Sequence, residues 1–537
     1  ATAVQILGSA TDRSDSLTFE KCTFTVTPGV VSTYVNPFEV SSLNTSPTST
    51  TYINATALTV DSCSVLNGYY GMTICAPTTT RSFGNRISNS VFFDNNYMFG
   101  YFYGVEKTLF ERNKFIGGGR QSTGTTYAMY LYYPGEGVVV NANEINGQNG
   151  GYGIYCAYAQ GTLSNKVKLT NNMIQIGTLA NQVYGVYVNY SSQLVMAHNA
   201  INVTSGSSTA TTFYMFSNNA TLYNTVDVIN NIFNNPNAGY AGWLGDGGTL
   251  FGITQIGLNW TINNNVYYGL GTYPYRSNNQ ITGTFAGWQN NTGLGNDSNS
   301  FVLNPNFVTP KNLRLNSIPL NDKGKGNTWV AADIDGNLRN ATTPDIGVTE
   351  FTPPADDAGI LSFVLPKAPI DTGLTDVRVL IKNYGSASLT SANVTYESGA
   401  TTFTQAYAGN IPSNGTDTVT FSATSGAGGT SQQFYYTGGN ISMRAYTSSP
   451  NTNLDADRGN DTLNLPVCLG MSGTYTINPS GSGARNFTNF NAALAALSCG
   501  GALGPVVFDV ANGTYTEQLT FGIIPGASAV NRIVFRS

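Results

Sequence analysis

"VKLTNNMI", residues 167–174, is an eight-residue phrase that recurs along the first half of the chain. It reads as an apolar residue, any residue, an apolar residue, two polar residues, a small polar anchor, any residue and an apolar residue. Further copies are "LTFEKCTF" at 17–24, "LTVDSCSV" at 58–65, "NRISNSVF" at 85–92, "TLFERNKF" at 108–115, "VVVNANEI" at 138–145, "LVMAHNAI" at 194–201, "VDVINNIF" at 226–233 and "WTINNNVY" at 260–267. Strand-like alternation with a period near thirty residues indicates a solenoid of β-strands and argues against helical repeats.

The anchor residues predict a parallel β-helix. Equivalent residues of successive coils lie about 4.8 Å apart in such a fold, so polar anchors at one turn stack into a ladder that satisfies backbone groups at the bend. The predicted ladder residues are Asn113, Asn143, Asn172, Asn199, Asn231 and Asn265, with Ser90 in an earlier coil. Cys22 and Cys63 occupy the same position in the first coils, within disulfide reach of each other. A bonded pair and two free thiols both fit this spacing.

A second repeated phrase carries tyrosines. It reads "YAMYLYYP" at 127–134, "YGIYCAYA" at 152–159 and "YGVYVNYS" at 184–191. If the apolar residues that flank each central tyrosine point inward, alternation turns the tyrosines outward. We therefore expect an exposed column of Tyr130, Tyr155 and Tyr187, preceded by Thr73 and followed by Phe216 and Thr254.

Two interpretations of this column stay open. Stacked aromatic rings shield strand backbone and stabilise neighbouring coils. Contiguous exposed aromatic residues also mark binding surfaces, here for a sugar polymer or another protein. Catalysis at this face is disfavoured, because Tyr, Phe and Thr stand where an acid/base pair and cationic groups would be needed.

Composition narrows the classes of partner. Charged residues make up 10% of the 537 residues and aromatic residues 12%, against a usual charged share of about 25%. Such a chain is expected to fold and is typical of extracellular all-β proteins. A net charge of −5 without a basic patch excludes nucleic acid as a predicted partner. Apolar runs of about 18 residues are missing, so no membrane insertion is expected.

Metal and catalytic candidates are few. Glu20, Asp61 and Glu111 stand two places before their anchors, where stacked carboxylates fit calcium or simply solvated turns. His198 is the single histidine and is interpreted as a turn residue. No cysteine and histidine spacing indicates zinc, so we predict no cofactor other than calcium and no catalytic residue.

The segment 304–351, "NPNFVTPKNLRLNSIPLNDKGKGNTWVAADIDGNLRNATTPDIGVTEF", resembles the closing segment of many bacterial β-helix domains. Together with the ladder phrase it makes residues 1–352 similar to the right-handed parallel β-helix of the pectate-lyase-like superfamily. Asp333, Asp335 and Asp345 form an oxygen-rich cluster in this segment. Because an EF-hand's remaining ligands are missing, we expect them to cap a turn and to pair with Arg339.

The remainder of the chain predicts two further parts. Residues 353–467 contain short alternating strands such as "DVRVLIKNYG" and "ISMRAYT", separated by turn signals. They predict an immunoglobulin-like sandwich and resemble CARDB-type adhesion modules. Residues 468–537 resemble the opening of a second β-helix, with a capping helix from about Phe487. Cys468 and Cys499 bracket that cap and are expected to be bridged, whereas Cys75 and Cys156 have no assigned partner.

The fold class is therefore all-β: a parallel β-helix, a sandwich and the capped start of a second β-helix. Because the first part begins in coils and the last part stops soon after its cap, we expect an excerpt from a tandem array. This arrangement resembles giant surface proteins of Bacteroidota exported by the type IX system, which act as adhesins, gliding-associated filaments or prey-grappling appendages.

The resemblance implies an extracellular, cell-surface structural segment whose partners are further copies or sister modules and surface glycans. A secreted polysaccharide lyase or hydrolase, or a non-catalytic carbohydrate-binding β-helix, is the alternative.

Overall fold

The computed structural model divides the chain into two units, residues 1–352 and residues 353–537. This division falls at the first boundary expected from the sequence. The structure describes the whole chain apart from residues 1, 10, 29–31, 44–45, 53–54, 119–124, 149–150, 178–182, 218–224, 238, 247–259, 273, 278–279, 293–295, 316–317 and 456.

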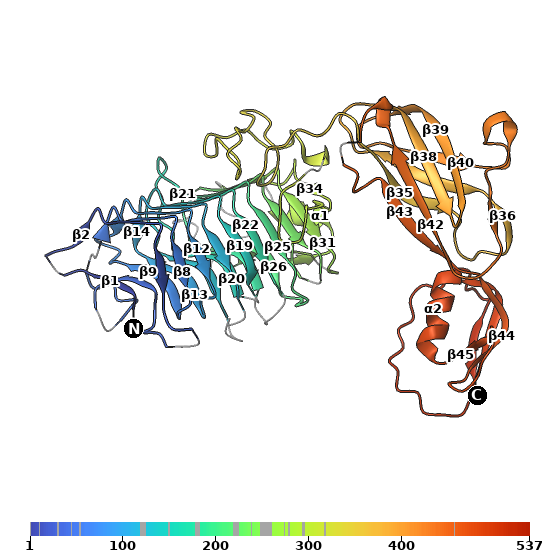
Figure 1. Cartoon of the computed structure of the whole chain (residues 1–537). Coiled ribbons are helices and arrows are strands. Elements are labelled where there is room, and N and C mark those ends of the chain that lie inside the picture. Colours follow the sequence, from blue (N-terminus) through green and yellow to red (C-terminus); the bar gives the residue numbers. More distant parts are fainter. Residues whose placement is uncertain are drawn as a thin grey trace. The chain divides into compact units, whose positions relative to one another are not determined.

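The first unit is a parallel β-helix made of three long sheets (Figure 1). The first sheet contains β1 (Val4–Leu7), β5 (Phe38–Ser41), β9 (Tyr70–Cys75), β13 (Met98–Tyr103), β17 (Tyr127–Tyr132), β20 (Gly151–Ala157), β23 (Val183–Asn189), β26 (Thr211–Ser217), β29 (Gly242–Asp246), β32 (Tyr275–Ser277) and β33 (Gln280–Thr282). The second sheet contains β3 (Thr18–Glu20), β7 (Thr59–Asp61), β11 (Arg86–Ser88), β15 (Leu109–Glu111), β18 (Val139–Asn141), β21 (Val167–Thr170), β24 (Leu194–Ala197), β27 (Val226–Ile229) and β30 (Trp260–Asn263). The third sheet contains β4 (Thr23–Thr25), β8 (Ser64–Leu66), β12 (Val91–Phe93), β16 (Lys114–Ile116), β19 (Glu144–Gln148), β22 (Met173–Ile176), β25 (Ala200–Val203), β28 (Ile232–Asn235), β31 (Val266–Gly269) and β34 (Phe301–Val302). Strand pairing within these sheets is parallel, except that β32 pairs antiparallel with β33.

Smaller elements complete this unit. Two short pairs, β2 (Ser14–Asp15) with β6 (Ala55–Thr56) and β10 (Ser82–Phe83) with β14 (Val105–Glu106), flank the early coils. Helix α1 (Phe285–Thr292) places Trp288, which is fully buried, in the same core as the coils. A short 3-10 turn covers Ile318–Leu320.

The apolar positions of the repeated phrase form the core, as alternation predicts. The third position of each copy points inward in the second sheet and is 0–1% exposed in Val60, Ile87, Phe110, Val140 and Leu169. The eighth position does the same in the third sheet, where the Phe92 and Phe115 rings stack at 4.7 Å. Each coil thus buries its apolar residues against the coils on either side.

The expected polar ladder is present and continuous. Each asparagine side-chain oxygen accepts the backbone N–H of the previous anchor, at 3.0 Å from Asn113 to Asn143, 3.1 Å from Asn143 to Asn172 and 3.0 Å from Asn172 to Asn199. The bonds continue through Asn231 and Asn265 at 3.0 and 2.9 Å. These side chains are 0–1% exposed. The ladder therefore satisfies buried backbone donors at every bend.

The residue before each anchor adopts a left-handed backbone. Its φ lies between 51° and 59° in Lys21, Ser62, Asn89, Arg112, Ala142, Asn171, His198, Asn230 and Asn264. Asparagine tolerates this conformation better than most residues. The "NN" pairs of the sequence therefore combine a left-handed turn residue with a ladder residue.

The second unit contains an antiparallel part and a parallel part. The antiparallel sheets are β35 (Ala358–Leu365), β37 (Val377–Asn383) and β40 (Thr416–Phe421); β36 (Gly373–Thr375) and β41 (Phe434–Tyr436); and β39 (Thr401–Ile411), β38 (Leu389–Ser398), β42 (Ile441–Ser448) and β43 (Thr462–Val467). The parallel sheet is β45 (Asn486–Phe487), β44 (Met471–Ile477), β46 (Ala502–Val510) and β47 (Ile533–Arg536). Short 3-10 turns cover Ala427–Gly429 and Pro450–Thr452. The two parts have separate hydrophobic cores.

Helix α2 (Phe490–Gly500) packs on the parallel sheet through Ala493, Leu494 and Leu497. It begins three residues later than the sequence suggested, because Asn489 is the N-cap and its side chain accepts the Ala492 N–H at 2.8 Å. A disulfide joins Cys468 to Cys499, the pair expected to bracket this helix.

Candidate functional site: the tyrosine face

The outward side of the first sheet carries a column of stacked tyrosines. Strand register aligns Tyr101, Tyr130, Tyr155, Tyr187 and Tyr214 across β13, β17, β20, β23 and β26. Their ring centroids are 5.2, 4.5, 5.0 and 4.6 Å apart in that order, with interplanar angles of 22°, 4°, 5° and 13°. We call these five residues the tyrosine column. It includes all three tyrosines predicted from the sequence.

A second column lies beside it, three residues earlier in each strand. Tyr127 and Tyr152 stack at 4.7 Å, and Tyr152 and Tyr184 at 5.0 Å. Contacts between the two columns are edge-to-face, at 82° between Tyr127 and Tyr130 and 83° between Tyr152 and Tyr155. Such a herringbone arrangement uses both favourable geometries of aromatic pairs.

This geometry limits what the face presents to solvent. Parallel rings 4.5 to 5.0 Å apart cover much of each other's faces, so ring edges form most of the accessible surface. The five tyrosines are half-buried. Burial raises the pKa of Tyr130 and of Tyr187 above that of a solvated phenol, so both phenols are neutral at physiological pH. The face is therefore an uncharged strip of phenol edges.

Both ends of the tyrosine column differ from the prediction. Thr73 aligns with Tyr101 as expected, but it is fully buried. Phe216 is out of register with the column, because it pairs with Asn189, two positions after Tyr187. The true successor is Tyr214, whose ring meets Trp243 at 5.0 Å and 77°. Thr254 lies outside the described residues.

Tyr101 and Tyr214 were missed because their strands, "MFGYFY" and "TTFYMFS", lack the repeated tyrosine phrase. A strand-by-strand count from the buried neighbours Phe102 and Phe213 would have found both.

Two of the three carboxylates proposed for calcium, Asp61 and Glu111, have protein partners. Asp61 accepts from the Ser88 hydroxyl at 2.6 Å and from the Asn89 amide at 2.7 Å, and these bonds lower its pKa. Glu111 accepts from the Asn141 amide at 3.0 Å. In the described part of the chain, no three His, Cys, Asp or Glu residues are grouped so that they could hold a metal ion.

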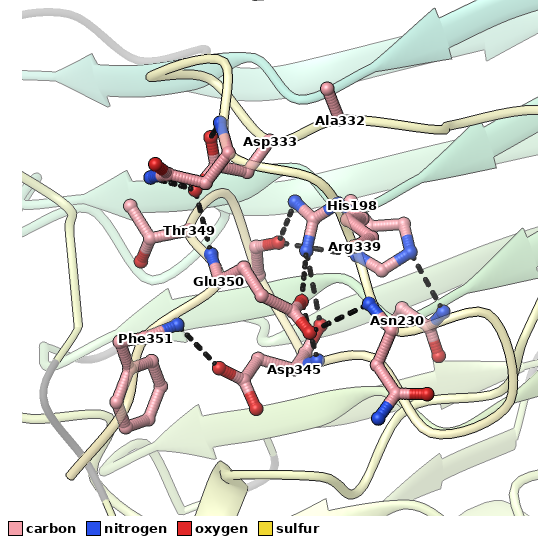
Figure 2. A network of polar contacts seen from close by, with 12 residues as sticks. His198, Asn230, Ala332, Asp333, Arg339, Asp345, Thr349, Glu350 and Phe351 are labelled. Carbon is pink, nitrogen blue, oxygen red and sulfur yellow. Dashed lines mark hydrogen bonds and ion pairs between the residues drawn. The ribbon is translucent and has the colours of Figure 1, made fainter.

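His198 lies in the left-handed turn before its anchor, as expected, and it is fully buried. The closing segment covers it completely, and Figure 2 shows the surrounding network. Its Nδ1 lies 3.3 Å from the Gly347 carbonyl oxygen, and its Nε2 lies 3.0 Å from the Asn230 amide nitrogen and 3.2 Å from that of Asn327. These partners fit a neutral ring with the proton on Nδ1. Burial, and then the charge of Arg339, hold the pKa of His198 well below its usual value.

Among the described residues, no carboxylate of Asp333, Asp335 or Asp345 forms an ion pair with Arg339, although Arg339 donates to the Asp345 backbone carbonyl at 3.4 Å. Asp333 caps a turn by accepting the backbone N–H groups of Asp335 and Asn337 at 2.9 and 2.8 Å. Asp335 instead forms an ion pair with Arg314 at 2.5 Å. Asp345 accepts backbone N–H groups of Asp322 and Phe351, both at 2.7 Å. The turn-capping part of the prediction is confirmed for Asp333, whereas the contact of Asp345 with Arg339 runs through the backbone.

The ion-pair partner of Arg339 is Glu350, at 3.4 Å (Figure 2). The guanidinium is buried and also donates to the Asn171 side chain at 2.8 Å and to the Gly347 carbonyl at 2.9 Å. It therefore ties the closing segment to the left-handed turn of an earlier coil.

The disulfide considered between Cys22 and Cys63 is not formed, and both thiols are free. The Cys63 sulfur accepts the Cys22 backbone N–H at 3.3 Å, while the Cys63 N–H donates to the Ser90 hydroxyl at 3.0 Å. The two thiols therefore stand in the polar ladder as hydrogen-bonding groups. Cys75 and Cys156 are buried thiols that are not part of a disulfide.

Comparison with known proteins adds little to this description. No protein-family model and no curated protein matches the chain. A solved structure, the CARDB domain of the PF1109 protein from Pyrococcus furiosus in complex with di-metal ions, is similar to 22% of this chain and 97% of its own. The identity is 16% and the TM-score 0.17, values at which the likeness carries no argument. Among the described residues, no helix has the length and hydrophobicity that a membrane span requires.

Proposed function

We propose that this chain is a structural segment of a long extracellular adhesin or filament, in which the β-helix acts as a rigid spacer. The observation that carries the proposal is the unbroken polar ladder. It runs from Cys22 through Ser90 and six asparagines to Ser300, whose hydroxyl receives the Asn265 N–H at 2.8 Å. Because each coil is hydrogen-bonded to both neighbours at the ladder as well as in three sheets, bending the rod would break several bonds at once.

The closing segment supports the same role. Along the rod, the outward column of the third sheet changes from Ser64, Val91, Lys114 and Glu144 to the uniformly apolar Met173, Ala200, Ile232 and Val266. These last four residues are at most 2% exposed because Leu313, Leu315, Ile346 and Val348 of the closing segment cover them. The segment thus reinforces later coils from outside.

The wider setting belongs to this proposal. A β-helix followed by an antiparallel module and a helix-capped parallel sheet suits a cell-surface protein of repeated modules, of the kind that Bacteroidota export by the type IX system. Partners would be further copies, sister modules or surface glycans.

Immunogold labelling of intact cells of the source organism tests the location and the role together. We expect gold particles along filaments or at the outer surface, at positions that antibody reaches without permeabilisation. Labelling that requires permeabilised cells would contradict the proposal.

A second candidate function is carbohydrate binding without catalysis, which the uncharged strip of phenol hydroxyls favours. A glycan array should compare the wild-type chain with a Tyr130/Tyr155/Tyr187→Ala triple variant and a matched →Phe triple variant. Binding lost in both variants would assign it to the hydroxyls, and binding lost only with alanine would assign it to the rings. The lyase alternative predicts unsaturated products from pectin or alginate, which absorbance detects.

A further inference from the structure

We propose that the tyrosine column is a site of oxidative cross-linking, at which a peroxidase and hydrogen peroxide couple stacked tyrosines of adjacent coils into dityrosine. This inference rests on the proposed extracellular mechanical function, because it supplies a covalent reinforcement of the rod.

Proximity selects the pairs. Tyr130 and Tyr155 lie 4.5 Å apart, and Tyr187 and Tyr214 lie 4.6 Å apart, each pair joining two neighbouring coils. Both are offset stacks held by paired parallel strands, so the two rings stay neighbours without any search of conformations. Within the column, Tyr155 and Tyr187, at 5.0 Å, form the next pair. Outside it, Tyr127 stacks on Tyr152 at 4.7 Å and Tyr133 on Tyr158 at 4.8 Å, so these pairs are secondary sites of coupling.

The reaction balances with one named oxidant. Each of two phenols loses one hydrogen atom, as a proton and an electron, and becomes a phenoxyl radical. The radicals join through a carbon–carbon bond between ring positions ortho to oxygen, and the displaced ring hydrogens return to the phenol oxygens. The peroxidase passes the two hydrogen atoms to hydrogen peroxide, which becomes two water molecules.

The surroundings of the tyrosine column allow this chemistry. Half-buried rings whose edges reach solvent can be oxidised by a peroxidase that meets the surface of this sheet. Cys156, the thiol next to Tyr155 in sequence, points into the core and is fully buried, so it is shielded from the same oxidant. An oxidised ring also has a stacked neighbour within reach on each side, which lets the radical move along the column to a coupling pair.

The second unit supplies an internal control. Tyr435 is 66% exposed and therefore open to oxidation, but among the described residues no ring contact brings another tyrosine to it. The rings that contact Tyr475 belong to phenylalanines, Phe487 and Phe508. Coupling within one chain should therefore concentrate in the first unit.

The test treats the full chain, at low concentration, with horseradish peroxidase and limiting hydrogen peroxide. Peptide mass spectrometry then maps cross-links. We expect dityrosine fluorescence, loss of two hydrogen atoms per link, Tyr130–Tyr155 and Tyr187–Tyr214 as the main cross-links, and a higher thermal midpoint of the β-helix. Tyr155→Phe keeps the ring stack but should abolish the Tyr130–Tyr155 link and leave Tyr187–Tyr214 in place, whereas Tyr435→Phe should change neither.

Cross-links spread over exposed tyrosines without preference for the column, or no intramolecular dityrosine, would overturn the proposal. Either result would leave the immunogold test of the structural role unaffected, so the two failures can be told apart.

Discussion

The two units of this chain are stabilised in different ways. Residues 1–352 repeat a single solution, a coil with inward apolar residues and one buried polar anchor. Residues 353–537 use separate solutions: an antiparallel core, a parallel sheet with its own core, and a disulfide from Cys468 to Cys499. In the first unit, a destabilising substitution in one coil should also affect the neighbouring coils through the ladder. In the second unit, the effect of such a substitution should remain local.

The largest expected effect comes from breaking the ladder. Asn172 accepts the Asn143 backbone and side-chain N–H groups at 3.1 and 3.0 Å, and it donates to the Val140 carbonyl and the Asn199 side chain. Asn172→Ala leaves several buried groups unpaired, which should cost about 3 to 5 kcal/mol of unfolding free energy at about 1 to 3 kcal/mol per group. Tryptophan fluorescence during urea unfolding reports this unit alone, since all four tryptophans lie in it.

Asn299→Ala is the matched control, because Asn299 is exposed and outside the ladder. It should change the unfolding free energy by less than about 0.5 kcal/mol. Equal effects of the two substitutions would show that the ladder does not stabilise the β-helix.

The next effect should be confined to the second unit. The Cys468–Cys499 bond spans a sequence separation of 31 residues, a loop for which cross-linking stabilises by about 3 to 4 kcal/mol. Cys468→Ser with Cys499→Ser should therefore speed hydrogen exchange in β44 and β46. A reducing agent should reproduce this in the wild-type chain and add nothing in the variant. A shift of the tryptophan transition would contradict the separation of the two units.

This difference also explains which parts of the structure could be predicted from the sequence. Periodicity predicted the coils, the anchors and three members of the tyrosine column, because the same pattern recurs in successive coils. It could not predict that Arg339 reaches Asn171 or that Asn327 reaches His198, since these contacts join residues 129 to 168 positions apart that have no repeat. Spacing alone also left Cys22 and Cys63 undecided, because a thiol in the ladder and a disulfide require the same proximity.

The two units should also differ in how their free energy of unfolding depends on pH. Burial raises the pKa of Asp357 to about 6 and that of Asp461 to about 7, where Asp455 and Asp357 add repulsion. A carboxyl whose folded pKa lies above its unfolded value of about 3.8 binds its proton more tightly in the native state, so its stabilisation is full below that value and is lost as pH rises through the folded pKa. The second unit should therefore lose on the order of 1 to 2 kcal/mol between pH 4 and pH 8, allowing for solvent screening.

In the first unit, two buried aspartates and one histidine act in opposite directions. Asp297 and Asp345, whose pKa values are both raised to about 6 by burial, follow the same sign. The pKa of His198 is lowered by burial, so His198 contributes stability above about pH 6.5 that is lost on acidification. Hydrogen exchange at several pH values should show that stability falls steadily with rising pH in residues 358–467. The change with pH should be weaker in the β-helix. Asp461→Asn should flatten the first trend; an unchanged slope would contradict the role of this carboxyl.

The smallest effect should come from removing a single phenol oxygen on each side of the comparison. Tyr396 of the sandwich is fully buried and donates to the Gln432 carbonyl at 2.9 Å, so Tyr396→Phe leaves that carbonyl unpaired and should cost about 1 kcal/mol. Tyr155→Phe keeps its stacks at 4.5 and 5.0 Å and loses a hydroxyl that is hydrogen-bonded to the Asn189 and Tyr130 side chains, which should change the unfolding free energy by no more than about 1 kcal/mol. Tyr155→Ala removes both stacks and should cost about 1 to 3 kcal/mol at about 0.5 to 1.5 kcal/mol per aromatic pair. If phenylalanine were as damaging as alanine in urea unfolding, the hydroxyl and not the ring stack would hold this face together.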